Sequence, residues 1–126
     1  MTRHRDITII GGGPTGLFAS FYAGLRGVSA RIIDSLPELG GQLMALYPEK
    51  YVYDVGGFPK IAARDLGRNL IEQGTQFGPD VRLEEQVLEL RPAGKGLVVV
   101  TNRGEYATGA VIIAGGKGAF AARELG

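Results

Sequence analysis

The chain has 126 residues, of which 21 are glycine and none is cysteine, and 14 Lys and Arg against 13 Asp and Glu give a net charge of +1. The absence of cysteine excludes disulfides, zinc–thiolate centres, iron–sulfur ligation and redox dithiols within this chain, and the single histidine leaves no His-rich metal site. Because there is no block of like charge, no long apolar run and no signal peptide, the composition predicts a globular cytoplasmic domain that binds neither nucleic acid nor membrane and holds no metal.

The first part of the chain predicts a strand–helix–strand unit. Residues 6–10 are rich in β-branched side chains, which indicates a buried parallel strand, and residues 30–34 predict a second one that ends in a carboxylate. Between them, residues 17–26 predict a helix. The apolar stripe of this helix repeats every fourth residue, at Leu17, Phe21 and Leu25. The unit spans about 30 residues, the size of a βαβ crossover.

A glycine motif, Gly11-x-Gly13-x-x-Gly16, joins the first strand to the helix. In a dinucleotide-binding fold the first glycine permits the tight turn, the second lets the backbone approach a pyrophosphate, and the third lets the helix pack closely on the strand. Asp34 follows Gly11 by 23 residues and is placed to accept hydrogen bonds from a ribose diol, while it would repel a 2′-phosphate. The order of elements predicts dinucleotide binding, against the alternative of a chance glycine turn.

The motif alone does not choose between NAD and FAD, but residues 35–60 bear on the choice. This stretch has no helical or strand period, and a long irregular stretch inside a small domain is usually functional. A turn at Gly40 and Gly41 would let the backbone lie against a flat ring, Gln42 offers a donor and an acceptor, and Tyr47 could stack on an aromatic cofactor. The alternative is an ordinary turn and a loop tyrosine that covers the core.

The second half of the chain predicts a helix, several short strands and a return to a buried strand. The predicted segments are a helix at 61–73, strands at 81–83 and 86–90, a hairpin of 97–101 with 105–108, and an apolar strand at 110–114. The fold class is therefore α/β, a Rossmann-like domain over residues 1–126 with a central parallel sheet and a small antiparallel insert.

Several local sequences carry a resemblance to a known family. They are GGGPTGLF at 11–18, GGQL at 40–43, ALYPEKY at 45–51, YDV at 53–55, GFPK at 57–60 and GAF at 118–120. Together they resemble the thioredoxin-reductase-like class of ferredoxin–NADP reductases over essentially the whole chain. The 45–51 segment is the most specific, because thioredoxin reductases proper share the glycine loop and the Gly-Gly-Gln turn but typically lack it.

The resemblance implies FAD as the cofactor and a role for several residues in binding it. Thr15 would lie beside the pyrophosphate, Asp34 at the adenosine ribose, Tyr47 on the isoalloxazine, Val87 at the adenine through its backbone, and Phe120 near the flavin. The cofactor-binding residues predicted in this way, with no residue predicted to be catalytic, are Gly11, Gly13, Pro14, Thr15, Gly16, Asp34, Gly41, Gln42, Tyr47, Val87 and Phe120. The chain departs from the family at Ala114-Gly115-Gly116, where Ala-Thr-Gly is common, and at Lys117.

The resemblance also implies an activity, in which NADPH reduces the flavin and the flavin passes electrons to ferredoxin or flavodoxin. Members of the family continue into an NADPH-binding domain and return to complete the FAD domain, so residues 1–126 correspond to an N-terminal portion that is inactive with NADPH by itself. The resemblance also implies a homodimer. The alternatives are a non-catalytic FAD- or nucleotide-binding module, a thioredoxin-reductase-like FAD domain, and the NAD-binding domain of an ordinary dehydrogenase.

Overall fold

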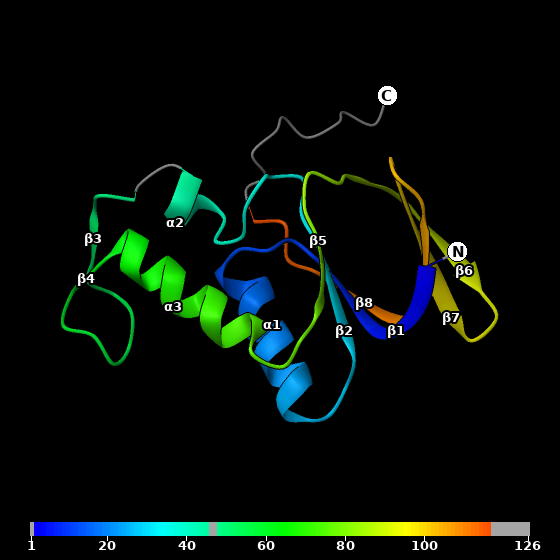
Figure 1. The fold of residues 1–126 in the computed structure, drawn as a ribbon, viewed down its shortest axis with the longest axis horizontal. Coiled ribbons are helices and arrows are strands. Elements are labelled where there is room, and N and C mark those ends of the chain that lie inside the picture. The colour runs from blue at the N-terminus through cyan, green and yellow to red at the C-terminus, as the bar shows by residue number, and fades with distance from the viewer. Residues whose placement is uncertain (1, 46–47, 117–126) are drawn as a thin grey trace.

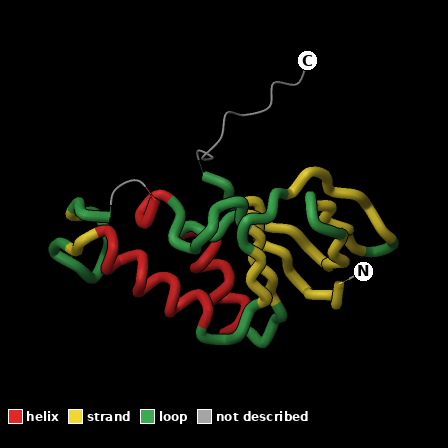
Figure 2. Tube along the Cα trace, turned by 45° about the horizontal axis from the view of Figure 1, so that its top comes forward, coloured by secondary structure: helices red, strands yellow, loops and turns green. Residues whose placement is uncertain are grey.

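The computed structural model describes residues 2–45 and 48–116, and in it two long helices lie together on one side of a mixed sheet (Figures 1 and 2). The elements in chain order are β1 (Thr2–Ile10), α1 (Pro14–Leu25), β2 (Ala30–Ile33), α2 (Gln42–Ala45), β3 (Tyr51–Val52), β4 (Ile61–Ala62), α3 (Ala63–Thr75), β5 (Asp80–Arg82), β6 (Val87–Ala93), β7 (Gly96–Thr101) and β8 (Glu105–Ile113).

The main sheet has six strands in the order β5-β2-β1-β8-β7-β6, and the short strands β3 and β4 pair separately. The first four strands in that order run parallel, and β6, β7 and β8 form an antiparallel meander. The predicted α/β class, with a parallel centre and an antiparallel addition, is confirmed. Helices α1 and α3 cover one face of the parallel part (Figure 1).

The end of the sheet differs from the prediction. The expected hairpin arm at 105–108 and the expected strand at 110–114 are one continuous strand, β8. Its first half pairs antiparallel with β7, and the same strand pairs parallel with β1 from Tyr106 to Ile113. One strand therefore joins the meander to the parallel sheet, a long-range pairing that no local sequence pattern reveals.

Helix α1 begins earlier than predicted and buries a different face. It starts at Pro14, because proline is favourable in the first helical turn, where its missing N–H would have no partner. Its buried residues are mostly small, and they are Gly16, Leu17, Ser20 and Ala23, whereas Leu25 is 57% exposed. The close approach of α3 explains this choice, since the Ser20 hydroxyl donates to the Gly74 carbonyl oxygen at 2.7 Å.

The core lies on both faces of the sheet, so β2 is buried along its whole length. On the helical face the buried cluster is Ile9, Leu17, Ala23, Ala30, Ile32 and Leu39. On the other face, Ile33 packs with Val99 and Tyr106 of the meander. Neighbouring residues of β2 thus face opposite layers, as the two-residue period of a strand requires.

Residues 35–60 are more ordered than predicted. They contain the one-turn helix α2 and strand β3, which pairs with β4 just before α3. Helix α3 consequently begins at Ala63, two residues later than the predicted start. In the described part of the chain, no helix has the length and apolar character needed to cross a membrane.

Candidate functional site

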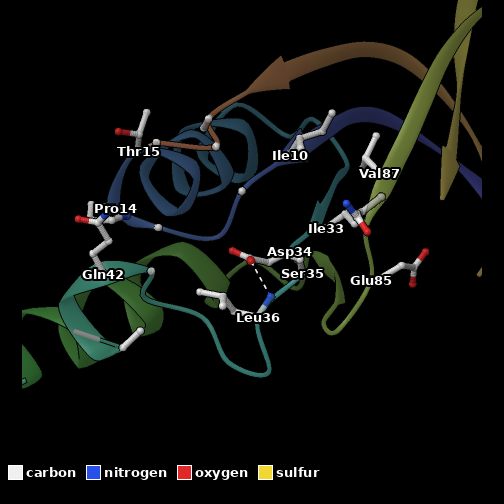
Figure 3. A pocket seen from close by; sticks show the side chains of 18 of the residues that line it. Ile10, Pro14, Thr15, Ile33, Asp34, Ser35, Leu36, Gln42, Glu85 and Val87 are labelled. Carbon is white, nitrogen blue, oxygen red and sulfur yellow. Dashed lines mark hydrogen bonds between the residues drawn. The ribbon is translucent and has the colours of Figure 1, made fainter. Parts of the chain in front are cut away.

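A cavity of about 870 Å³ opens at the carboxyl ends of the parallel strands (Figure 3). β2 and β5 lie on one side of β1, and β8 lies on its other side. The strand order therefore reverses at β1. In open α/β sheets, ligands bind at the carboxyl ends beside such a reversal. The lining residues are Ile10, Gly11, Gly13, Pro14, Thr15, Ile33, Asp34, Ser35, Leu36, Gly41, Gln42, Leu43, Ala45, Glu85, Gln86, Val87, Ala114, Gly115 and Gly116.

The glycine loop turns sharply at Gly11, whose φ of +114° favours glycine. Its N–H donates to the Ile33 carbonyl oxygen at 2.9 Å, and a side chain at this position would collide with the carbonyl group of Ala114. Gly16 does not line the cavity. A methyl group there would collide with the Gly11 carbonyl oxygen, so Gly16 is the position that lets α1 pack against the loop.

The N-terminus of α1 faces the cavity, and no side chain of the helix itself caps it. Its cap residue, Gly13, provides no side-chain hydrogen bond, and the first turn contains no acidic residue. Pro14 and Thr15 are exposed and line the cavity. The positive end of the helix dipole and the N–H groups of its first turn can therefore receive an anion such as a pyrophosphate.

Asp34 follows β2 and is held in place by two backbone N–H groups. The Gly12 N–H donates to its Oδ2 at 2.6 Å. The Leu36 N–H donates to its Oδ1 at 2.9 Å (Figure 3). A carboxylate oxygen can accept more than one hydrogen bond, so both oxygens keep acceptor capacity. The carboxylate is thus oriented in the cavity wall and able to receive the two hydroxyls of a ribose.

A second glycine turn lies against the first. A Cβ at Gly41, where φ is +59°, would lie 3.0 Å from the Gly13 Cα, and the Gly40 N–H donates to the Gly12 carbonyl oxygen at 2.8 Å. Gln42 begins α2 directly after this turn, is exposed and lines the cavity. Figure 3 shows Gln42 and Thr15 at one end of the cavity, Val87 and Glu85 at the other, and Asp34 between them.

The structure thus gathers most of the predicted site residues around one cavity. They are Gly11, Gly13, Pro14, Thr15, Asp34, Gly41, Gln42 and Val87. Gly16 lies behind the loop, and Tyr47 and Phe120 lie outside the described residues.

Sequence reasoning missed several lining residues, namely Ser35, Leu36, Glu85 and Gln86. Ser35 and Leu36 follow Asp34 directly, so the position of Asp34 could have predicted that they line the cavity. Glu85 and Gln86 stand between two short strands, and nothing in their sequence marks them. Gly115 and Gly116 also line the cavity. The cluster of glycines after the last strand is the sequence feature that could have predicted their place.

The described lining residues include the carboxylates of Asp34 and Glu85 and no lysine or arginine. Binding of a phosphate here would therefore depend on backbone N–H groups and the helix dipole. The arrangement suits an extended ligand with an anionic middle, a diol near Asp34 and a planar group at the Gly41 turn.

Comparisons with known proteins agree with this geometry. Residues 9–58 match the family described as NAD(P)-binding Rossmann-like domain. Over 121 residues, 95% of this chain, the sequence is 57% identical to ferredoxin–NADP reductase 2 of Bacillus mycoides and covers 37% of that protein. Over 124 residues, 98% of this chain, it is 53% identical to ferredoxin–NADP reductase of Thermus thermophilus, again covering 37%.

This chain is homologous to a part of the ferredoxin–NADP reductases. It spans a little over a third of the length of these relatives. Among solved structures, it resembles thioredoxin reductase of T. acidophilum with a TM-score of 0.79 and 28% identity, covering 89% of this chain and 35% of that one. The thioredoxin reductase of Streptococcus pyogenes gives a TM-score of 0.79 and 27% identity, covering 98% of this chain and 38% of that one. The resemblance inferred from the sequence motifs is confirmed.

Proposed function

We propose that this chain binds FAD and forms part of the FAD domain of a flavoprotein reductase. The observation that carries the proposal is the fixed carboxylate of Asp34 beside the uncapped N-terminus of α1, at the reversal of strand order. A ribose diol and an anionic pyrophosphate are adjacent in FAD, and this pair of features matches them. The sequence similarity to ferredoxin–NADP reductases supports the same conclusion.

The residues that would hold FAD follow from their places around the cavity. Thr15 and the first turn of α1 would bind the pyrophosphate, Asp34 the adenosine ribose, and the backbone of Val87 the adenine. Gly41 and Gln42 would lie at the flavin end. We include Tyr47 and Phe120 as flavin contacts on the basis of the family resemblance alone.

When bound, FAD supplies the redox chemistry, since it can accept a hydride and release single electrons. The protein's part is then to bind and orient the cofactor. By similarity to the relatives, we propose that the whole reductase is a cytoplasmic homodimer that takes electrons from NADPH and gives them to ferredoxin or flavodoxin. Residues 1–126 would form the N-terminal part of its FAD domain, and the NADPH site would lie elsewhere.

A titration tests the binding half of the proposal. Adding FAD to the chain should quench flavin fluorescence with a saturable curve, and NAD should compete weakly. Failure to take up FAD would overturn the proposal, and tighter binding of NAD would favour the domain of an ordinary dehydrogenase.

A turnover assay tests the role of the chain. With FAD, NADPH and an artificial acceptor present, we expect binding of FAD without oxidation of NADPH, because the nicotinamide site is not among these residues. Steady NADPH oxidation by this chain would contradict that assignment, and a full-length protein that binds FAD without turnover would favour a non-catalytic module.

A further inference from the structure

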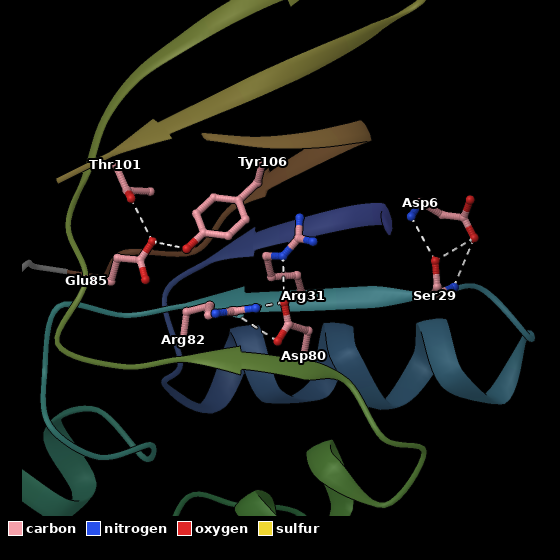
Figure 4. A network of polar contacts seen from close by, with 8 residues as sticks. All are labelled: Asp6, Ser29, Arg31, Asp80, Arg82, Glu85, Thr101 and Tyr106. Carbon is pink, nitrogen blue, oxygen red and sulfur yellow. Dashed lines mark hydrogen bonds and ion pairs between the residues drawn. The ribbon is translucent and has the colours of Figure 1, made fainter. Parts of the chain in front are cut away.

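We propose that Glu85 is a positioning residue that fixes the adenosine end of the cavity through hydrogen bonds to Thr101 and Tyr106. The inference rests on the proposed function and adds to it a residue for which neither the motifs nor the comparisons provide a role. Glu85 is 3% exposed and belongs to the segment between β5 and β6. Its carboxylate points away from Asp34 and toward the meander, so it acts from behind the wall (Figures 3 and 4).

Two hydroxyl groups converge on one oxygen of this carboxylate. The Tyr106 hydroxyl donates to Glu85 Oε2 at 2.5 Å, and the Thr101 hydroxyl donates to the same atom at 2.6 Å (Figure 4). The Thr101 oxygen in turn accepts the N–H groups of Arg103 and Gly104. The Thr101 hydroxyl lies closer to Glu85 Oε2, at 2.6 Å, than to its other acceptor, the Gly104 carbonyl oxygen, at 3.3 Å. The carboxylate thereby ties its segment to the end of β7 and the start of β8.

The backbone of the same segment is bonded to the ribose side of the cavity. The Glu85 N–H donates to the Asp34 carbonyl oxygen at 3.0 Å, and the Glu84 N–H donates to the Leu36 carbonyl oxygen at 3.0 Å. Since Glu85, Gln86 and Val87 all line the cavity, a shift of this segment would move the adenine wall and the Asp34 loop together.

The surroundings of Glu85 are suited to a buried carboxylate. The guanidinium groups of Arg31 and Arg82 lie over the Tyr106 ring, with their Cζ atoms 4.6 and 5.6 Å from its centroid. Asp80 accepts hydrogen bonds from both arginines, so two formal positive charges stand near two negative ones. Burial and the hydrogen bond to Glu85 raise the pKa of Tyr106, which keeps its hydroxyl in the donating form.

The test compares ADP and FAD binding in matched variants. Loss of the hydrogen bonds to the buried Glu85 carboxylate should weaken the binding of ADP and FAD by about tenfold or more. We therefore expect Glu85→Ala to weaken FAD and ADP binding by the same factor. Glu85→Gln should restore most of the affinity, because its amide oxygen can accept both hydroxyls. Gln42→Ala, at the flavin end, should weaken FAD and leave ADP unchanged.

Ser20→Ala is the control for a general loss of stability, since it removes a buried hydrogen bond between α1 and α3 whose two residues do not line the cavity. It should lower the melting temperature without changing ADP affinity. If Glu85→Ala does not fold, Tyr106→Phe decides the matter, because it removes only one donor. A folded Tyr106→Phe with weaker ADP binding supports the inference, and unchanged ADP affinity overturns it.

Two failures are distinguishable. If the wild-type chain binds neither FAD nor ADP, the proposed function is wrong and this inference falls with it. If the wild-type chain binds both and a folded Glu85→Ala binds ADP equally tightly, only the role of Glu85 is wrong.

Discussion

The carbonyl oxygen of Gly11 occupies the space that a side chain at Gly16 would need. The first residue of the loop and the first turn of α1 are therefore in direct contact, and the angle at which the helix leaves the strand depends on the missing Cβ. The same contact aims the N-terminus of α1 at the cavity.

Gly16→Ala should destabilise the fold. The added methyl group must push α1 away from the loop, and overpacking of this kind costs about 1–3 kcal/mol in the free energy of unfolding. Urea denaturation measures the change. Gly56→Ala is the matched control, because a Cβ there meets nothing within 4 Å, and it should leave stability nearly unchanged. Equal stability of the two variants would contradict this account of Gly16.

Asp34→Ala should weaken the binding of FAD and of ADP. Loss of the hydrogen bonds from a ribose to the carboxylate predicts a change of about 1–3 kcal/mol in binding free energy, which isothermal titration with ADP would measure. Asp54→Ala removes an exposed carboxylate outside the cavity and serves as the control. ADP affinity that is the same in both variants would remove Asp34 from the site.

Acid should destabilise the chain through Asp80. Burial acts to raise the pKa of Asp80, but hydrogen bonds from Arg31 and Arg82 outweigh it, and the pKa is lowered from 3.8. A carboxyl group whose pKa is lower in the folded state stabilises the fold above the unfolded pKa, and this contribution is lost as the pH falls through the folded pKa. Urea midpoints should therefore drop below about pH 4.

Asp80→Asn provides the comparison. It should be less stable than the wild type at pH 7 and should lose less stability on acidification, so the two pH profiles converge at low pH. Parallel profiles would show that Asp80 does not contribute to the acid sensitivity.

Glu84→Gly should leave the fold as stable or make it more stable. Glu84 is the one non-glycine residue with positive φ in the described ranges, at +53°, a conformation that costs a residue with a Cβ about 1–2 kcal/mol. Glycine removes this cost but loses about 0.5–1 kcal/mol through the greater freedom of the unfolded chain. Glu84→Ala keeps the strain and should be nearly neutral, and a Glu84→Gly variant markedly less stable than Glu84→Ala would contradict the argument.

The sequence was sufficient to predict the parts of the fold that depend on local patterns. The β-branched run before Gly11 and the glycine loop lie where predicted, because strand period and turn chemistry are local properties. The first strand starts four residues earlier than predicted, at Thr2, and the second ends at Ile33, one residue before Asp34. The cavity residues of these segments follow from the same motif. Tyr47 and Phe120 stay predictions.

The parts that sequence did not predict depend on contacts between distant segments. The exposure of Leu25 follows from α3, which approaches α1 along its small residues and leaves the larger ones outside. β8 is one continuous strand because it pairs with β7 of the meander on one side and with β1 of the parallel sheet on the other. The role of Glu85 could not be predicted, because its partners Thr101 and Tyr106 belong to the meander and reach Glu85 only when β8 joins the meander to the parallel sheet.

The contact of Gly41 with Gly13 restricts how this cavity could be redesigned. Where the two turns meet, a side chain at Gly41, whose φ is +59°, would press on the Gly13 Cα, so substitution at Gly41 distorts its turn before it alters which ligand is preferred. An engineer who wishes to change the ligand has side chains to work with at Ser35, Gln42 and Gln86, which line the same cavity. Directed evolution of this scaffold should therefore accumulate its useful changes at those positions and keep Gly41.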